Sequence, residues 1–240
     1  MENATYAALT RQFGLWSEMR STANNVANAA TTGYRSEDVI FSEYIRRLGG
    51  EEDSLSMASA RVRETSMAQG ALVQTGGSYD LAIEGEGFFW IATPAGERLT
   101  RAGHFMPNLA GDLVTPQGYA VLDPGGAPLF IPPDARTVGI ASDGTISADG
   151  RPIGQIAIVR PSNMDDLRRE DGVRFSTPSG VEPVEGPRMV QGFLEESNVD
   201  AVTQIARMIE VSRAYELGAG FLDREDERIR TAIRDLSKQG

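Results

Sequence analysis

Cysteine is absent from this chain of 240 residues, and histidine occurs once, at position 104. The absence of cysteine excludes disulfide bonds, thiol catalysis and cysteine-ligated metal sites. One histidine cannot build a histidine cluster for a metal ion, and we find no partners that would make it part of a Ser-His-Asp triad. We therefore expect no metal and no cofactor, and we interpret His104, which stands beside Phe105, as a structural residue.

Long apolar runs and an excess of basic residues are also missing. Since no stretch of about 18 apolar residues occurs, we expect no membrane insertion. Acidic residues outnumber basic ones by 34 to 23, which gives a net charge of −11 and argues against nucleic acid as a partner. The N-terminal segment MENATYAALTRQF has neither the basic nor the apolar region of a secretory signal. Export, if it occurs, is therefore expected without a cleaved signal peptide.

A long amphipathic helix is predicted over residues 197–236. Ser197 and Asn198 are suitable N-cap residues, and Asp200 places negative charge in the first turn. Apolar or small residues recur every three or four positions and form one seam along the helix, which needs a partner helix to cover it. The seam consists of Val202, Ile205, Ile209, Ser212, Tyr215, Ala219, Leu222, Ile229, Ile233 and Leu236.

This seam is longer than a domain of this size comfortably covers. At about 1.5 Å per residue, roughly forty residues make a helix of about 60 Å. Gly218, Gly220 and Asp226 weaken the seam, and their positions predict a kink or a stutter there.

A second amphipathic helix is predicted over residues 3–30 and is followed by Gly33, a natural stop. Its apolar positions are Leu9, Phe13, Trp16, Met19, Ala23, Val26 and Ala30. Because both ends of the chain carry similar seams, we expect the two helices to pair as a coiled-coil-like core domain made of residues 1–33 and 193–240.

Asn24, Asn25 and Asn28 crowd the last turns of the N-terminal helix. Asparagine is a poor residue for a helix interior, because its amide competes with the backbone. One interpretation is that these amides form hydrogen bonds across an interface between subunits. The alternative is a polar, fraying helix end.

The rest of the chain divides into two parts. Residues 34–78 show no clear period, and we interpret them as an extended connecting region. Residues 79–192 contain short strand-like runs separated by turn pairs such as Asp143-Gly144 and Asp149-Gly150, which is typical of an antiparallel all-β domain. The predicted fold class is α+β, with long terminal helices and a mainly antiparallel β middle domain.

An enzyme active site is not evident. The Gly85–Gly87 segment is too short for a dinucleotide fingerprint and precedes a strand instead of a helix. Asp143 and Asp149 are accounted for by turn geometry, and no calcium-loop spacing surrounds them. We expect no catalysis and no small-molecule substrate. A hydrolase that uses two carboxylates far apart in the chain remains an alternative.

Paired motifs at the two ends carry a family resemblance. Residues 24–28 (NNVAN) and 31–35 (TTGYR) resemble the N-terminal signature of bacterial flagellar axial proteins, the rod and hook group. Residues 197–199 (SNV), 208–209 (MI) and 213–216 (RAYE) resemble the matching C-terminal signature.

The middle of the chain is similar to the same group in YDLAIEGEGFF and in LTRAGHF followed by GDLVTPQGYAVL. The resemblance thus covers most of the chain. The length and the short stretch before YDLAIEGEGFF are more similar to proximal-rod than to distal-rod subunits. Distal-rod subunits of the same family are the alternative.

The resemblance implies a structural subunit of the flagellar basal-body rod in the periplasm. Such subunits leave the cytoplasm through the flagellar type III export apparatus, assemble helically around the export channel and transmit motor torque. Their terminal helices form the inner layer, and the β domain lies outside. The implied partners are other copies and neighbouring rod proteins. The residues expected at this assembly interface are Leu9, Phe13, Trp16, Met19, Asn24, Asn25, Val26, Asn28, Val202, Ile205, Ile209, Tyr215 and Leu222.

A function from a different class also fits the predicted architecture. A β-rich binding module or adhesin carried on a two-helix stalk would show the same order of helix, β domain and helix. Dependence of secretion on the flagellar exporter distinguishes the two.

Overall fold

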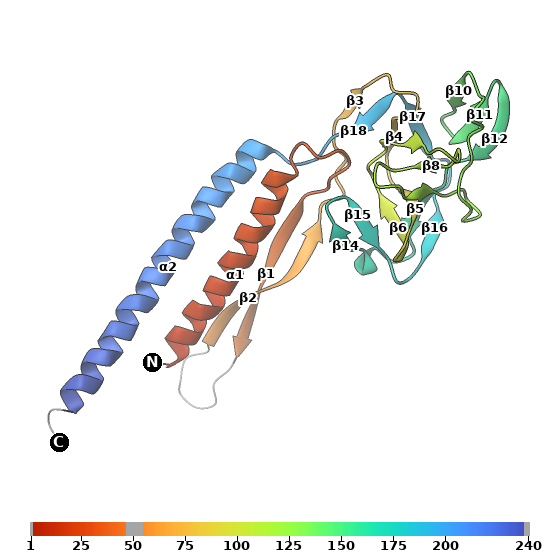
Figure 1. Cartoon of the computed structure of the whole chain (residues 1–240). Helices are drawn as coiled ribbons and strands as arrows, with labels where there is room; N and C mark the ends of the chain where they lie inside the picture. Colours follow the sequence, from red (N-terminus) through yellow and green to blue (C-terminus); the bar gives the residue numbers. More distant parts are fainter. Residues whose placement is uncertain (1, 47–54, 238–240) are drawn as a thin grey trace. The chain divides into compact units, whose positions relative to one another are not determined.

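The chain divides into two compact units. The computed structural model describes residues 2–46 and 55–237, and Figure 1 shows their helices and strands. One unit, here called the helical unit, consists of Met1–Ala27, Ser36–Ser66 and Asp200–Gly240. The other, the β unit, consists of Asn28–Arg35 and Met67–Val199.

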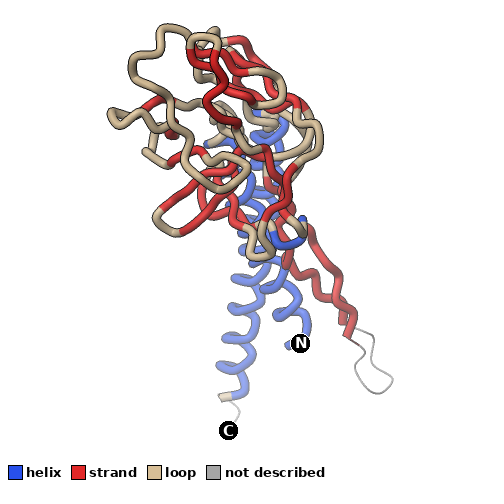
Figure 2. Tube along the Cα trace, turned by 90° about the vertical axis from the view of Figure 1, so that its right-hand side faces the viewer, coloured by secondary structure: helices blue, strands red, loops and turns tan. Residues whose placement is uncertain are grey.

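The helical unit contains two helices and a hairpin. Helix α1 (Glu2–Ala27) and helix α2 (Ala201–Leu236) lie side by side, as both views show (Figures 1 and 2). Strands β1 (Glu37–Arg46) and β2 (Leu55–Thr65) pair antiparallel and pack against α1.

The hairpin corrects the prediction that residues 34–78 form an extended connection. β1 and β2 pair over their whole lengths, with one irregularity between Ile40 and Phe41. Such a bulge displaces the alternation of apolar and polar residues by one position. A period-two pattern is therefore interrupted in the sequence, although the strands pair with each other.

Helix α2 begins at Ala201, later than the predicted start at residue 197. The Asp200 carboxylate is the N-cap and accepts hydrogen bonds from the backbone N–H groups of Val202 (3.0 Å) and Thr203 (3.4 Å). Hydrogen bonds from the Thr203 hydroxyl and from these amides hold the pKa of Asp200 below its ordinary value. An aspartate that satisfies the first free amides fixes the helix start at its own position.

Helix α1 ends at Ala27, before the predicted end at residue 30. Asn28 closes a turn there, because its backbone carbonyl accepts from the Thr31 amide (3.0 Å) and its side-chain oxygen from the Thr31 hydroxyl (3.1 Å). Gly33 follows with φ of +69°, and a Cβ at this position would lie 2.3 Å from the backbone nitrogen of Ala102. The glycine is thus required by backbone conformation and by close approach.

The β unit is antiparallel, as predicted. Its largest sheet has the strand order β14-β15-β6-β5-β9-β8-β7, with β13 pairing β5 and β16. The strands of this sheet are β5 (Phe88–Thr93), β6 (Gly96–Thr100), β7 (Met106–Pro107), β8 (Leu113–Val114), β9 (Ala120–Val121), β13 (Ile158–Pro161), β14 (Arg168–Asp171), β15 (Arg174–Ser176) and β16 (Val181–Pro183).

Smaller sheets complete this unit. β10 (Val138–Ile140), β11 (Thr145–Ala148) and β12 (Arg151–Gln155) form a three-stranded sheet. Two strand pairs are β17 (Arg188–Gln191) with β4 (Leu81–Glu84) and β18 (Phe193–Glu195) with β3 (Leu72–Gln74). A short 3₁₀ helix spans Met164–Asp166.

The core of the β unit explains the continuous apolar run at the start of β5. This strand is central, and its side chains alternate between two hydrophobic clusters: Phe89 and Ile91 join one, and Phe88 joins the other. Phe89 packs edge-on against Phe105, with ring centroids 5.0 Å apart. A strand buried on both faces reads as a run of apolar residues without alternation.

The described helices do not include one that is both long enough and apolar enough to pass through a membrane.

Candidate functional site

Helix α1 has an inverted distribution of polarity. Leu9, Phe13 and Trp16 are 43, 66 and 46% exposed. Among residues 7–27 of α1, the buried side chains are polar or charged: Gln12, Glu18, Ser21, Thr22 and Asn25. A helix of an independently folded globular protein places its apolar face inward. The outward apolar face of α1, defined here by Leu9, Phe13 and Trp16, is therefore a candidate contact surface.

Polar contacts join α1 to α2. The Gln12 side-chain amide donates to the Tyr215 carbonyl (3.0 Å), and Arg207 Nε donates to Glu18 Oε1 (2.6 Å). Farther along, Asn25 Nδ2 lies 3.2 Å from Gln204 Oε1. As the residue numbers rise along α1, those of the contacting residues in α2 fall, so the two helices are antiparallel.

Helix α2 also exposes much of its predicted seam. Val202, Ile205 and Ile209 are 77, 49 and 47% exposed, whereas Val211, which the predicted seam omitted, is buried. Leu217 and Phe221 add to the exposed apolar surface of α2 at 74 and 44%. The remaining residues expected at an interface divide by exposure: Asn24 is exposed, and Met19, Val26, Asn28, Tyr215 and Leu222 are half-buried.

Asn25 forms side-chain hydrogen bonds within the chain. Its side chain is 1% exposed. Its Nδ2 donates to the Glu37 carbonyl and its Oδ1 accepts from the Glu37 amide, both at 2.9 Å. Ser21 Oγ donates to the same carbonyl at 2.6 Å. The amide thus pairs with the first residue of β1 as a neighbouring strand would, and it fastens the hairpin to α1.

Asn25→Ala is expected to destabilise the free chain by about 2–3 kcal/mol, because it leaves the Glu37 amide buried without its partner. Urea denaturation of the purified chain, followed by circular dichroism, measures this loss. Gln74→Ala, which removes an amide from an exposed position in β3, should change stability by less than about 0.5 kcal/mol. An unchanged midpoint for Asn25→Ala would show that its pairing with Glu37 is dispensable.

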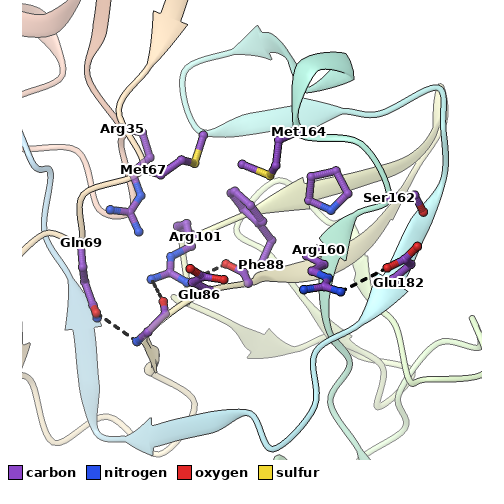
Figure 3. A pocket seen from close by; sticks show the side chains of 13 residues that line it. Arg35, Met67, Gln69, Glu86, Phe88, Arg101, Arg160, Ser162, Met164 and Glu182 are labelled. Carbon is purple, nitrogen blue, oxygen red and sulfur yellow. Dashed lines mark hydrogen bonds and ion pairs between the residues drawn. The ribbon is translucent and has the colours of Figure 1, made fainter.

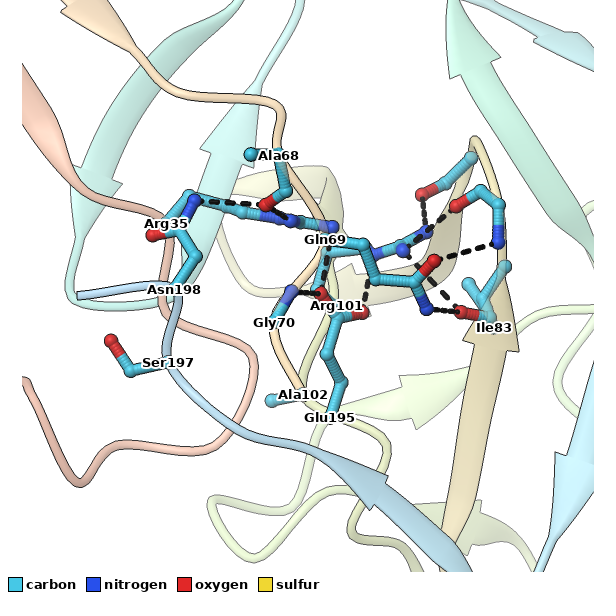
Figure 4. Close-up of polar contacts among 12 residues, drawn as sticks. Arg35, Ala68, Gln69, Gly70, Ile83, Arg101, Ala102, Glu195, Ser197 and Asn198 are labelled. Carbon is cyan, nitrogen blue, oxygen red and sulfur yellow. Dashed lines mark hydrogen bonds and ion pairs between the residues drawn. The ribbon is translucent and has the colours of Figure 1, made fainter. Parts of the chain in front are cut away.

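A buried charged junction lies inside the β unit (Figure 4). Glu195, at the end of β18, is 1% exposed. One carboxylate oxygen lies 2.8 Å from Arg101 Nε, and the other lies 2.8 Å from Arg35 Nη2. Both guanidinium groups are buried as well. A buried carboxylate shared by two arginines is stable only when its charge and hydrogen bonds are satisfied.

Arg101 is held by more than its ion pair. Its terminal nitrogens donate to the carbonyls of Gly87 (2.6 Å) and Gly85 (2.8 Å), and one lies 3.4 Å from the Ile83 carbonyl. Burial lowers the pKa of Arg101 to about 10, although Glu195 opposes this shift. The side chain therefore organises the GEG segment, for which the sequence offered no role.

The junction gathers the segments that enter and leave the β unit. The Glu195 backbone carbonyl accepts from the Gly33 amide (2.7 Å), and its carboxylate accepts from the Gly70 amide (3.0 Å). Asn198 Nδ2 donates to the Ala68 carbonyl (2.9 Å). The chain thus passes through this one cluster after α1, after β2 and before α2.

Sequence reasoning identified parts of this junction as family motifs, since Arg35 ends TTGYR and Arg101 lies in LTRAGHF. It missed Glu195, which lies two positions before Ser197, the first residue of the C-terminal motif. The available signal was an acidic residue at the end of a strand-like run. This signal does not indicate which residues lie near that carboxylate in the folded chain.

A pocket of about 510 Å³ lies beside the junction (Figure 3). Met67, Phe88 and Met164 supply its apolar lining, and an Arg160–Glu182 pair stands at its edge with 3.4 Å between nitrogen and oxygen. Across residues 2–46 and 55–237, no group of three or more His, Asp and Glu side chains is arranged to hold a metal ion.

The aspartates of the predicted Asp-Gly turns take part in structural contacts. Asp143 accepts from the Thr145 amide (2.9 Å), and Asp149 accepts from the Thr137 amide (3.0 Å). The bonds from Thr145 lower the pKa of Asp143. Asp149 itself has φ of +49°, a turn conformation that aspartate tolerates. His104 pairs with Asp80 at 2.6 Å.

Comparison with known proteins identifies the family. Residues 82–148 match the flagellar hook protein FlgE/F/G D1 domain, and residues 190–235 match the flagellar basal body rod FlgEFG protein C-terminal domain. These segments include Arg101 and Glu195 of the junction and most of α2.

Full-length relatives extend the match. The chain is 38% identical to the flagellar basal-body rod protein FlgF of Caulobacter vibrioides, over 99% of both chains. It is 36% identical to FlgF of Mesorhizobium japonicum over the full length of both, and 30% identical to the rod protein FlgG of Bacillus subtilis over 97% of this chain and 98% of that one. The chain belongs to the family of flagellar basal-body rod proteins and is of the FlgF type.

Proposed function

We propose that this structural rod subunit assembles with copies of itself and with neighbouring basal-body components through the exposed apolar faces of α1 and α2. The observation that carries the proposal is the inverted polarity of α1, in which Phe13 and Trp16 face outward while Glu18 and Asn25 are buried. Full burial of such a side chain contributes about 1.5–3 kcal/mol, and covering Phe13 and Trp16 adds the share that belongs to the 66 and 46% of their surfaces that are still exposed. This stabilisation is available only when another chain supplies the cover.

The proposed contact is heterologous. A surface that meets a different surface on the next copy generates an open helical array unless the rotation closes. A helical rod around a central channel follows from such a contact, with the helical unit as the inner layer and the β unit outside. A rod built this way transmits motor torque through its subunit contacts.

Pairing of α1 and α2 as a coiled-coil-like core is part of the proposal. Half-buried and buried residues of α2 recur at alternating intervals of four and three, which is the spacing of a coiled-coil seam. Seven of them keep this spacing, namely Gln204, Met208, Val211, Tyr215, Gly218, Leu222 and Glu225, and other half-buried residues, such as Ser212 and Ala219, lie beside that seam. The antiparallel contacts of Gln12 and Glu18 with α2 support it.

The family membership supports a periplasmic location in the basal body, reached through the flagellar type III export apparatus without a cleaved signal peptide. We propose a purely structural role without catalysis. A distal-rod role, as the FlgG relatives suggest, is the second candidate, and a binding module on a helical stalk is disfavoured by the family membership.

Deletion of the gene tests the proposal. Cells without this chain are expected to retain the motor rings but to lack hook and filament, and electron microscopy of purified basal bodies shows which parts are present. Expression of the intact chain from a plasmid should restore swimming. Normal swimming of the deletion strain would overturn the rod assignment.

A further inference from the structure

A groove of about 610 Å³ runs between α1 and α2 within the helical unit. Small residues from both helices contribute to its lining, and Leu217 and Phe221 stand at it with 74 and 44% of their surfaces exposed. The small residues of the lining are Ala7, Ala8, Ala214 and Gly218. An apolar groove of this kind is suited to the apolar face of another helix.

Gln12 places an unsatisfied polar atom in this groove. The side chain is 8% exposed, and its Nε2 donates to the Tyr215 carbonyl at 3.0 Å. Its Oε1 is buried and has no hydrogen-bond partner among the residues that the structure describes. A buried carbonyl without a donor is costly, and a side-chain N–H brought into the groove would remove that cost.

Gly218 explains why the amide fits at this position. A Cβ on Gly218 would lie 2.1 Å from Gln12 Nε2, so any other residue would displace the amide. Helix α2 continues without interruption through this glycine. Gly218 thus provides space for a polar group inside an apolar seam.

The outward face of α1 has the chemistry that the groove requires. Leu9, Phe13 and Trp16 supply apolar surface. The same face carries N–H donors in the Trp16 indole and in Arg20, whose guanidinium carbon lies 4.8 Å from the centre of the Trp16 ring. Groove and face belong to one chain but lie on different surfaces, which is the requirement for a heterologous contact.

We propose that the groove at Gln12 and Gly218 receives the outward face of α1 from a second copy of this chain, with a side-chain N–H of that helix bound to Gln12 Oε1. This inference rests on the proposed rod function. A single polar group in an apolar helix contact fixes the register of the contact, because every shifted register leaves it unpaired. Gln12 thus determines how far one copy is displaced along the next.

Disulfide cross-linking tests the contact, and the absence of native cysteine makes each introduced thiol unique. One plasmid-borne copy carries Phe13→Cys and the other Leu217→Cys, and basal bodies are isolated after mild oxidation. We expect a disulfide-linked dimer. A control pair of Phe13→Cys with Leu109→Cys, at a fully exposed turn of the β unit, should give only background. Equal yields from the two pairs in swimming cells would overturn the contact while leaving the rod assignment intact.

Gln12→Leu tests the register in the same assay. The variant should still fold, although it also loses the intrachain hydrogen bond to the Tyr215 carbonyl, and its dimer yield should fall about fivefold, as expected for one lost hydrogen bond. Gln74→Leu makes the same chemical change at an exposed position and should leave the yield unchanged. A full yield with Gln12→Leu would overturn the register role of this amide.

Discussion

Glu195→Ala is expected to lower the free energy of unfolding by about 3–5 kcal/mol, which is the usual effect of removing one member of a buried ion pair. The substitution leaves the guanidinium groups of Arg35 and Arg101 buried without their shared carboxylate. It also removes the acceptor of the Gly70 amide. Urea denaturation of the full chain, followed by the fluorescence of its two tryptophans, Trp16 and Trp90, measures the loss.

Glu182→Ala is the matched control for this prediction. Glu182 pairs with Arg160 at 3.4 Å, but both side chains are about half exposed, so the change should be below about 1 kcal/mol. Similar losses for the two variants would show that burial of the Glu195 cluster adds nothing to its strength. Because the cluster binds the segments that follow α1 and β2, Glu195→Ala should also make these connections more sensitive to protease.

Ile209→Asp is expected to abolish rod assembly without unfolding the chain. Ile209 is 47% exposed in the single chain, so the aspartate remains in contact with water until assembly. Burying its charge in an intersubunit contact then costs about 3 kcal/mol or more, which lowers association at least about a hundredfold. Swimming on soft agar and the recovery of hooks on basal bodies measure the defect, and circular dichroism of the purified variant verifies the fold.

Ile153→Asp is the control for the assembly defect. Ile153 lies in β12 of the β unit and is 37% exposed, so the substitution adds the same charge at a position of similar exposure. Cells with this variant should swim. Normal swimming with Ile209→Asp would remove the helix faces from the proposed interface.

The helices and the antiparallel β unit could be predicted from the sequence, because both depend on local periodicity. The heptad-like spacing in α2 and the Asp-Gly turns around β11 are visible within short windows. The direction in which the periodic residues point was not predictable in the same way. Phe13 and Val202 were expected to pack at a helix contact, and in the single chain both are exposed.

Contacts between residues far apart in the sequence were the hardest to predict. The sequence does not show that the Asn25 amide bonds to the backbone of Glu37, because only folding brings these two residues together. An interface role for this amide was therefore a reasonable interpretation of the sequence. Glu195 meets Arg35 and Arg101 across 160 and 94 positions of sequence respectively, and no single-sequence pattern encodes such a distance. The hairpin was missed for a related reason, since its pairing includes a bulge that breaks the alternation of β1.

In the proposed assembly, the outward-facing side chains of α1 determine how the rod responds to temperature. Removing Leu9, Phe13 and Trp16 from water lowers the heat capacity of the system, and near room temperature the gain is almost entirely entropic. Such contacts weaken on cooling. Rods built from this subunit should therefore lose cohesion in the cold while the β unit, with its densely hydrogen-bonded junction, stays folded.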